Sequence, residues 1–246
     1  MNDRELTEQK RLDDLREEVI EMTTHELRTP LTAIHAALHL MLSGDFGPLP
    51  EAHKKFAEMA YANCERMTRM INDFLDMQKI ESGRSQFKML PIEIVPLVEA
   101  AILANSSYAG RFAVSFSFKK PEARLWVSGD ADALIQVLTN LLSNAAKYSP
   151  SNASVDVEVA RRGAMIRVSV ADHGPGIPQE FRDRIFQRFA QIGGTDPRKK
   201  GSGLGLRIAK DIVERLGGAI GFDTKDGQGS TFHFELPEAR GNGAHD

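Results

Sequence analysis

The sequence predicts two domains of different class, an all-α antiparallel helical hairpin followed by an α+β two-layer sandwich. From about residue 6 to residue 82, apolar residues recur at alternating steps of three and four, which is typical of paired helices. After residue 91, short alternating runs separate helical segments, which indicates strands packed against helices. The expected divisions are a helical domain at 1–82, a linker at 83–91, an α+β domain at 92–238 and a disordered tail at 239–246.

The composition favours a soluble protein of a reducing compartment. A net charge of −3 with interspersed signs argues against binding to nucleic acid or to a membrane surface. The single cysteine, Cys64, excludes a disulfide framework and a cysteine metal cluster. No apolar run approaches the roughly 18 residues of a membrane span, and no signal peptide opens the sequence.

The first predicted helix runs from about Leu6 to Leu42 and contains one proline, Pro30. Its apolar stripe has a step of five between Met22 and Leu27, which shifts the stripe by one residue. Pro30 also removes the N–H that would bond to the carbonyl four residues earlier. We therefore expect a bend point in this helix.

The glycine- and proline-rich stretch 43–50 predicts a turn into a second amphipathic helix, which ends near residue 81. A short connection between two long helices makes an antiparallel hairpin. Because a lone hairpin leaves one apolar face in water, we expect a homodimeric four-helix bundle through residues from about 10 to 82. The alternative is a monomer in which this face packs on the second domain.

The second domain mixes helices and strands. Asp130 is the expected N-cap of its central helix. The expected order is helix 96–109, strand 112–118, strand 125–127, helix 130–147, strands 155–159 and 166–170, helix 203–216, and a hairpin of 219–223 with 230–236.

The stretch THELRTPLTAI, residues 24–34, combines a nucleophile-type side chain, a carboxylate and a hydroxyl within about one helical turn. His25 is a nucleophile at neutral pH, Glu26 is an adjacent carboxylate, and Thr29 is a hydroxyl one turn further on. The stretch resembles the phosphoacceptor box of two-component sensor histidine kinases.

Asn140, Asn144 and Lys147 fall at steps of four and three, on one face of the predicted helix. Carboxamide oxygens suit Mg²⁺, and a lysine can meet phosphate as a point charge. The string of residues 136–150 resembles the N box of histidine kinases. The resemblance implies ATP and Mg²⁺ as cofactors, with Asn144 as the main metal ligand, Asn140 in support, and Tyr148 against the nucleotide.

Two glycine-rich motifs follow. In residues 170–178 a strand leads into Asp172, Gly174, Gly176 and Ile177, which resembles the first glycine box, whose aspartate reads the adenine amine. The apolar residues of 181–189 predict a helical ridge that resembles the F box, although phenylalanines at this spacing are also ordinary core residues.

The segment 190–205 predicts a mobile lid that leads into a helix, whose N-terminal amides suit phosphate oxygens. Its basic run at 198–200 would meet phosphate or would be solvated. The closing Gly227–Phe232 stretch matches the last strand of the family pattern, with Thr231 expected at the nucleotide. The lid's second glycine box supplies the remaining expected nucleotide contacts: Gly201, Ser202, Gly203, Leu204, Gly205 and Leu206.

The boxes occur in the family's order, and the family fold joins a phosphotransfer bundle to a Bergerat-type ATP-binding domain. The resemblance implies that ATP phosphorylates His25 with Glu26 as general base, and that the phosphoryl group passes to an aspartate of a response-regulator receiver domain. It also implies that Thr29 supports phosphatase activity, and that the chain is cytoplasmic, possibly as part of a larger sensor. His173 departs from the Asn or Asp that is frequent at its position.

Two alternatives stay open. The related ATPases of gyrase, chaperone and mismatch-repair type place a hydrolytic Glu where this chain has Asn140, and they lack the THELRTPL helix. A catalytically weak dimeric scaffold, or a phosphatase-only regulator, would bind ATP without labelling His25. The signal, the cognate regulator, and transfer within or between protomers are open from the sequence.

Overall fold

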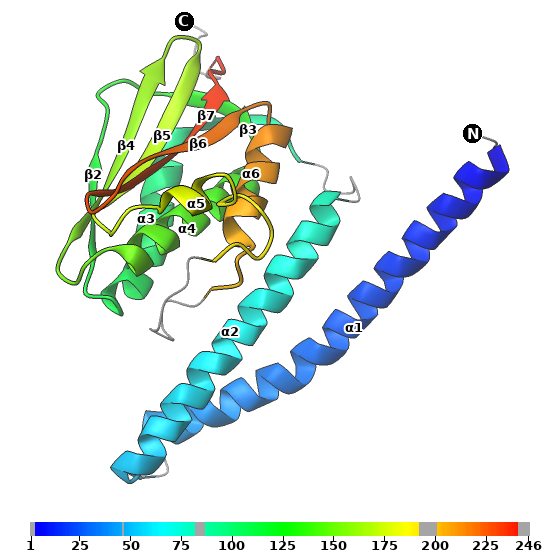
Figure 1. Cartoon of the computed structure of the whole chain (residues 1–246), viewed down its shortest axis with the longest axis vertical. Coiled ribbons are helices and arrows are strands. Elements are labelled where there is room, and N and C mark those ends of the chain that lie inside the picture. The colour runs from blue at the N-terminus through cyan, green and yellow to red at the C-terminus, as the bar shows by residue number, and fades with distance from the viewer. Residues whose placement is uncertain (1–2, 46, 82–86, 192–200, 241–246) are drawn as a thin grey trace, which may run out of the picture. The chain divides into compact units, whose positions relative to one another are not determined.

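The computed structural model describes residues 3–45, 47–81, 87–191 and 201–240. The chain divides into two compact units, Met1–Arg84 and Ser85–Asp246, which are described one at a time (Figure 1). None of the described helices combines the length and the apolar character that a membrane span requires.

The first unit is an antiparallel pair of helices, α1 at Asp3–Ser43 and α2 at Glu51–Glu81. The prediction of a hairpin is confirmed, and α1 continues through Pro30 without interruption. The thiol of Cys64 donates to the carbonyl of Leu31 across the pair over 3.3 Å. The buried apolar residues of the described hairpin are Leu31, Ala57, Cys64, Met77 and Ile80.

The second unit contains a five-stranded sheet in the order β2-β4-β5-β7-β6. Strand β2 pairs with β4 in parallel, and the other neighbours are antiparallel. The strands are β2 at Ser115–Lys119, β4 at Ser154–Arg162, β5 at Met165–Asp172, β6 at Ala219–Lys225 and β7 at Gly229–Pro237. A separate two-stranded sheet pairs β1, Leu90–Glu93, with β3, Trp126–Gly129.

Helices α3 (Ile94–Gly110), α4 (Ala131–Tyr148) and α6 (Gly205–Arg215) cover one face of the five-stranded sheet (Figure 1). Burial alternates along the strands, as expected for a sheet with helices on one face. On β4, Val155 and Val157 are buried, whereas Asp156 and Glu158 are exposed. The predicted two-layer α+β sandwich is confirmed.

Three expectations for this unit differ from the structure. Strand β1 begins at Leu90, inside the segment expected as linker, whose residues 83–86 lie outside the described part. The strand expected from residue 112 begins at Ser115, because the chain turns at Ala113 with a φ of 53°. The tail expected from residue 239 is held at its start, where the N–H of Ala239 donates to Trp126 over 2.9 Å; residues 241–246 lie outside the described part.

The expected helical ridge at 181–189 is wrong. Only one helical turn forms there, α5 at Gln179–Arg182. The ring of Phe186 packs on the sheet instead, with its centroid 6.0 Å from that of Phe222 and 6.5 Å from that of Phe232. Phe189 is 64% exposed and has a φ of 59°. Contacts with the sheet therefore override the helical spacing of these phenylalanines.

Candidate nucleotide and phosphoacceptor sites

Helix α4 carries three of the expected nucleotide residues on one face. Asp130 caps the helix, since its Oδ1 accepts from the N–H groups of Asp132 and Ala133, each over 3.1 Å. Further along, Asn140 and Asn144 are half-buried, and Lys147 is only 7% exposed although it is charged. The cap and the buried leucines of the opposite side fix this face in place.

The second glycine box lies directly against this face of α4. A β-carbon on Gly205 would stand 2.8 Å from Oδ1 of Asn140, and one on Gly201 would stand 3.2 Å from Nζ of Lys147. Ser202 accepts from the N–H of Leu204 over 3.2 Å, which shapes the turn before α6. The second glycine box therefore packs against α4 because glycine, which has no side chain, lets the backbone approach the polar side chains of Asn140 and Lys147.

Asp172 ends β5 in a buried position, with 7% of its surface exposed. Its Oδ1 accepts from the N–H of Gly174 over 2.8 Å and from the N–H of Ser230 over 3.3 Å. Burial raises the pKa of Asp172, and the two N–H donors and the neighbouring His173 offset this rise only in part. The carboxyl group is thus prepared to accept a further hydrogen bond from a ligand.

The first glycine box lies between the end of α4 and the β6–β7 turn. A β-carbon on Gly174 would stand 2.7 Å from the carbonyl oxygen of Tyr148, a distance that a side chain does not allow. On its other side, the carbonyl of Pro175 accepts from the N–H of Gly227 over 2.8 Å. Burial, followed by the nearby Tyr108, raises the pKa of the Tyr148 phenol. Asp172, Tyr148 and the first glycine box therefore form one continuous surface with α4.

The structure does not bring Thr231 to this surface. Thr231 pairs with Ala171, so its side chain lies on the opposite face of the sheet from Asp172. Ser230 is the residue paired with Asp172, and its hydroxyl lies 2.9 Å from Oγ1 of Thr224 on β6. Thr224 was missed, although its alternation with Ile220 and Phe222 along the strand could have placed it on the helix-covered face.

Two expected features lie at the limits of the described residues. Residues 192–200, which hold most of the expected lid and its basic run, lie outside the described part. His173, the departure from the family pattern, lies beside β4, with its Nε2 3.2 Å from Oδ2 of Asp156.

The expected phosphoacceptor lies on α1 of the first unit. The backbone of His25 is helical, and its side chain lies outside the described part. Glu26 and Thr29 are exposed on the same helix. Beside them, Nη2 of Arg28 donates to Oδ1 of Asn72 on α2 over 3.0 Å, which ties this turn of α1 to its partner helix.

The α4 face fits Mg²⁺ together with phosphates rather than a cage of protein ligands. Among the described residues, no group of three or more His, Cys, Asp or Glu side chains is placed to hold a metal ion. Mg²⁺ commonly takes few protein oxygens and completes its shell with substrate phosphates and water. The carboxamides of Asn140 and Asn144, with Lys147 beyond them, supply this kind of donor set.

Comparison with known proteins matches one domain family in each of the two units. Residues 15–83 match the family "His Kinase A (phospho-acceptor) domain", and residues 129–240 match "Histidine kinase-, DNA gyrase B-, and HSP90-like ATPase". Sensor histidine kinase WalK of Bacillus subtilis is 35% identical over 95% of this chain, and histidine protein kinase DivJ of Caulobacter vibrioides is 33% identical over 87% of it. The chain spans only 38% and 36% of the length of these relatives.

Solved structures give the same result. Full-length ShkA in complex with AMPPNP aligns with a TM-score of 0.72 and 26% identity, over 91% of this chain and 46% of that one. The catalytic domain of histidine kinase ThkA aligns with a TM-score of 0.54 and 28% identity, over 62% of this chain and 96% of that one.

Fold and sites together define a protein with a phosphoacceptor helical hairpin and an ATPase domain of the gyrase and HSP90 type. The chain belongs to the two-component sensor histidine kinases and carries their catalytic portion.

Proposed function

We propose that this chain is an ATP-dependent protein-histidine kinase whose phosphoacceptor is His25. The observation that carries the proposal is the single surface formed by Asn140, Lys147, Asp172 and the two glycine boxes. This surface offers a carboxylate for a nucleobase amine at one end, and carboxamides with a cation for phosphates at the other. The AMPPNP complex of the similar ShkA supports a nucleotide in this fold.

The chemistry is an in-line transfer from ATP to the imidazole. A ring nitrogen of His25 forms the new N–P bond while the bond from the γ-phosphorus to the oxygen of ADP breaks. The proton on the other ring nitrogen passes to the carboxylate of Glu26, which acts as general base. Asn144 and Asn140 would hold a Mg²⁺ ion bound with the nucleotide, and this ion would neutralise phosphate charge. Lys147 binds phosphate, and Asp172 orients the adenine.

The phosphoryl group then passes from His25 to an aspartate of a receiver domain. Thr29 lies one turn further along α1, and we expect its hydroxyl to orient the water that hydrolyses the resulting acyl phosphate. A Thr29→Ala variant would keep autophosphorylation but would remove label more slowly from a receiver domain that the chain has phosphorylated.

The hairpin would form a homodimer through residues from about 10 to 82. Leu27, Ile34 and Met41 recur every seven residues on α1 and are 48%, 51% and 46% exposed. Met67 and Phe74 on α2 have the same spacing and are 52% and 36% exposed. Large apolar side chains in two such stripes favour a second hairpin as the partner, because a four-helix bundle buries both.

The test is incubation of the chain with γ-labelled ATP and Mg²⁺, followed by acid and alkali treatment. The parent and a His39→Gln control should carry label that is stable in alkali and lost in acid, whereas His25→Gln should carry none. Label that persists in His25→Gln would assign the acceptor elsewhere. A parent that binds ATP but takes no label would instead favour the scaffold or phosphatase-only alternative.

A further inference from the structure

Thr224 on β6 connects three segments around Asp172 through one hydroxyl group. Its Oγ1 lies 2.9 Å from the N–H nitrogen of Ile177, 2.9 Å from Oγ of Ser230 and 3.2 Å from the carbonyl oxygen of Gly229. Ile177 belongs to the first glycine box, and Gly229 and Ser230 begin β7.

The direction of each hydrogen bond follows from the inventory of a hydroxyl, which has one proton and two lone pairs. The N–H of Ile177 can only donate, so it occupies one lone pair of Thr224. The carbonyl of Gly229 can only accept, so it takes the proton of Thr224. The remaining lone pair of Thr224 must then accept the proton of Ser230, which leaves the Ser230 oxygen able only to accept from any further partner.

The Ser230 hydroxyl stands beside the carboxyl group of Asp172. The two residues are paired across β5 and β7, and both are buried on the helix-covered face. The Ser230 N–H already donates to Oδ1 of Asp172. This edge of the site therefore presents acceptors only: a carboxylate and a hydroxyl whose proton is engaged elsewhere. A base with an exocyclic amine can donate to it, whereas a base with a carbonyl at that position meets acceptor against acceptor.

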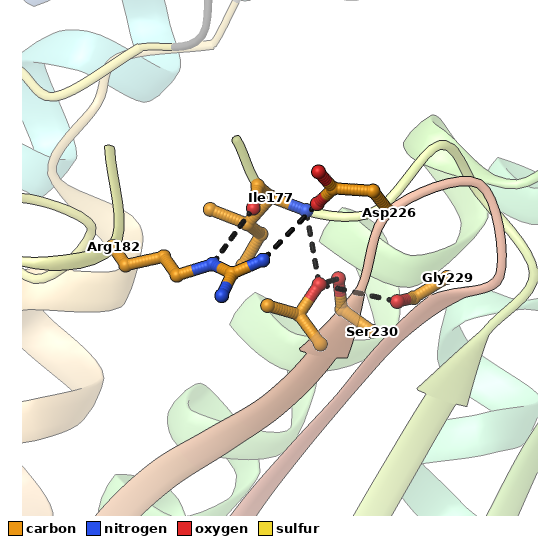
Figure 2. A network of polar contacts seen from close by, with 6 residues as sticks. Ile177, Arg182, Asp226, Gly229 and Ser230 are labelled. Atoms are coloured by element: carbon orange, nitrogen blue, oxygen red, sulfur yellow. Dashed lines mark hydrogen bonds and ion pairs between the residues drawn. The ribbon is translucent and has the colours of Figure 1, made fainter. Parts of the chain in front are cut away.

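A second contact fixes the same segment from the other side. Nε of Arg182 donates to the carbonyl of Ile177 over 3.1 Å, and Nη2 of Arg182 donates to Oδ1 of Asp226 over 3.1 Å (Figure 2). The Ile177 backbone is thus held at its N–H by Thr224 and at its carbonyl by Arg182. The first glycine box cannot move away from Ser230 without breaking one of these bonds.

We propose that Thr224 is a positioning residue which, by orienting the Ser230 hydroxyl, makes the site prefer a purine with a 6-amino group over one with a 6-oxo group. The proposal rests on the proposed nucleotide site at Asp172. It adds a source of base selectivity in a residue that itself need not touch the base.

The test compares ATP with ITP, which carries a carbonyl in place of the 6-amino group. Dissociation constants for both are measured by calorimetry with Mg²⁺ for the full chain and for Thr224→Val, Thr224→Ser, Ser230→Ala and Ser169→Ala. Thr224→Val frees the Ser230 proton to meet the 6-oxo group, so the ATP:ITP affinity ratio should fall about three- to tenfold, the effect of roughly one net hydrogen bond. Thr224→Ser, which keeps the hydroxyl, and Ser169→Ala, on the open face of β5, should keep the parent ratio.

The outcomes separate this proposal from the proposed function. Ser230→Ala should lower the ATP:ITP affinity ratio as Thr224→Val does. If circular dichroism shows that Thr224→Val does not fold, Ser230→Ala replaces it as the test variant. Equal weakening of ATP and ITP in Thr224→Val or Ser230→Ala, with the ratio unchanged, would mean a purely structural role and would overturn the proposal. A parent chain that binds neither nucleotide would overturn the proposed function itself.

Discussion

Gly205 lies so close to Asn140 that a β-carbon at position 205 would stand 2.8 Å from Oδ1 of that carboxamide. The first residue of α6 therefore packs directly against the middle of α4. A substitution at Gly205 thus tests the metal and phosphate end of the site without altering a polar group.

We expect Gly205→Ala to weaken ATP binding about tenfold or more, the size of one disturbed charged contact. Alanine is the better helix former, so the displaced carboxamide of Asn140, rather than a weakened α6, would be the cause. Calorimetric titration with ATP and Mg²⁺ measures the effect. Gly110→Ala is the control, since a β-carbon at Gly110 has no atom within 4 Å. Binding as tight in Gly205→Ala as in the parent would show that the Asn140 side chain can shift without loss.

Asp172→Asn should stabilise the empty fold and weaken ATP binding. The pKa of Asp172 lies above its ordinary value of 3.8 in the folded chain, chiefly because of burial. Ionisation therefore destabilises the fold as the pH rises from 3.8 through the folded pKa, and the full penalty applies above both. The variant keeps Oδ1 as acceptor for Gly174 and Ser230.

Thermal unfolding from pH 4 to pH 8 measures this. The melting temperature of Asp172→Asn should exceed that of the parent at pH 7, and the difference should shrink as the pH falls toward 4. ATP affinity at pH 7 should fall about ten- to a hundredfold, since a hydrogen bond to a charged acceptor is lost. A lower melting temperature for the variant at pH 7 would mean that the carboxylate stabilises the fold.

Ile34→Glu should dissociate the proposed dimer. Ile34 is 51% exposed on the free face of α1, and a carboxylate there would be buried without a partner in a four-helix bundle. Light scattering after gel filtration should give a dimer mass for the parent and a monomer mass for the variant at low micromolar concentration. Ala36→Glu is the control. Ala36 is exposed, and because it lies two residues after Ile34 its side chain points away from the stripe of Leu27, Ile34 and Met41. A monomeric parent would contradict the proposed interface.

Glu26→Gln should lower the rate of autophosphorylation about 10²- to 10⁴-fold, the usual effect of losing a general base. The dissociation constant for ATP should stay within about twofold, because Glu26 lies on the hairpin and the nucleotide surface on α4. Initial rates with γ-labelled ATP measure the effect, with Glu58→Gln on the exposed surface of α2 as the control. Unchanged rates in Glu26→Gln would assign the proton to another acceptor.

The sequence alone predicted the features that depend on residues close to one another in the chain. The hairpin follows from helical spacing, and Asp130 was identified as an N-cap because a carboxylate before an apolar helical run satisfies its first N–H groups. The clustering of Asn140 and Lys147 follows from helix periodicity alone.

Features that depend on distant pairing were missed or misplaced. Strand β1 is four residues long and forms only because β3 pairs with it. Thr231 was placed in the site although the pairing of Ser230 with Asp172 sends it to the other face. Phe186 has helical spacing but packs on Phe222 across the sheet. In each case the deciding partner is remote in the sequence, so neither propensity nor periodicity could reveal it.

The face of the five-stranded sheet opposite to α3, α4 and α6 makes the ATPase unit convenient for site-specific labelling. Cys64 is 4% exposed in the hairpin and would react slowly with a thiol-directed dye. Ser117 is exposed on β2, and its neighbour in the register is Asp156, on the face of the sheet opposite to the one that α3, α4 and α6 cover. A Ser117→Cys chain would thus offer one fast-reacting thiol on the opposite face of the sheet from Asp172 and α4, and the attached dye would report rotation of the unit.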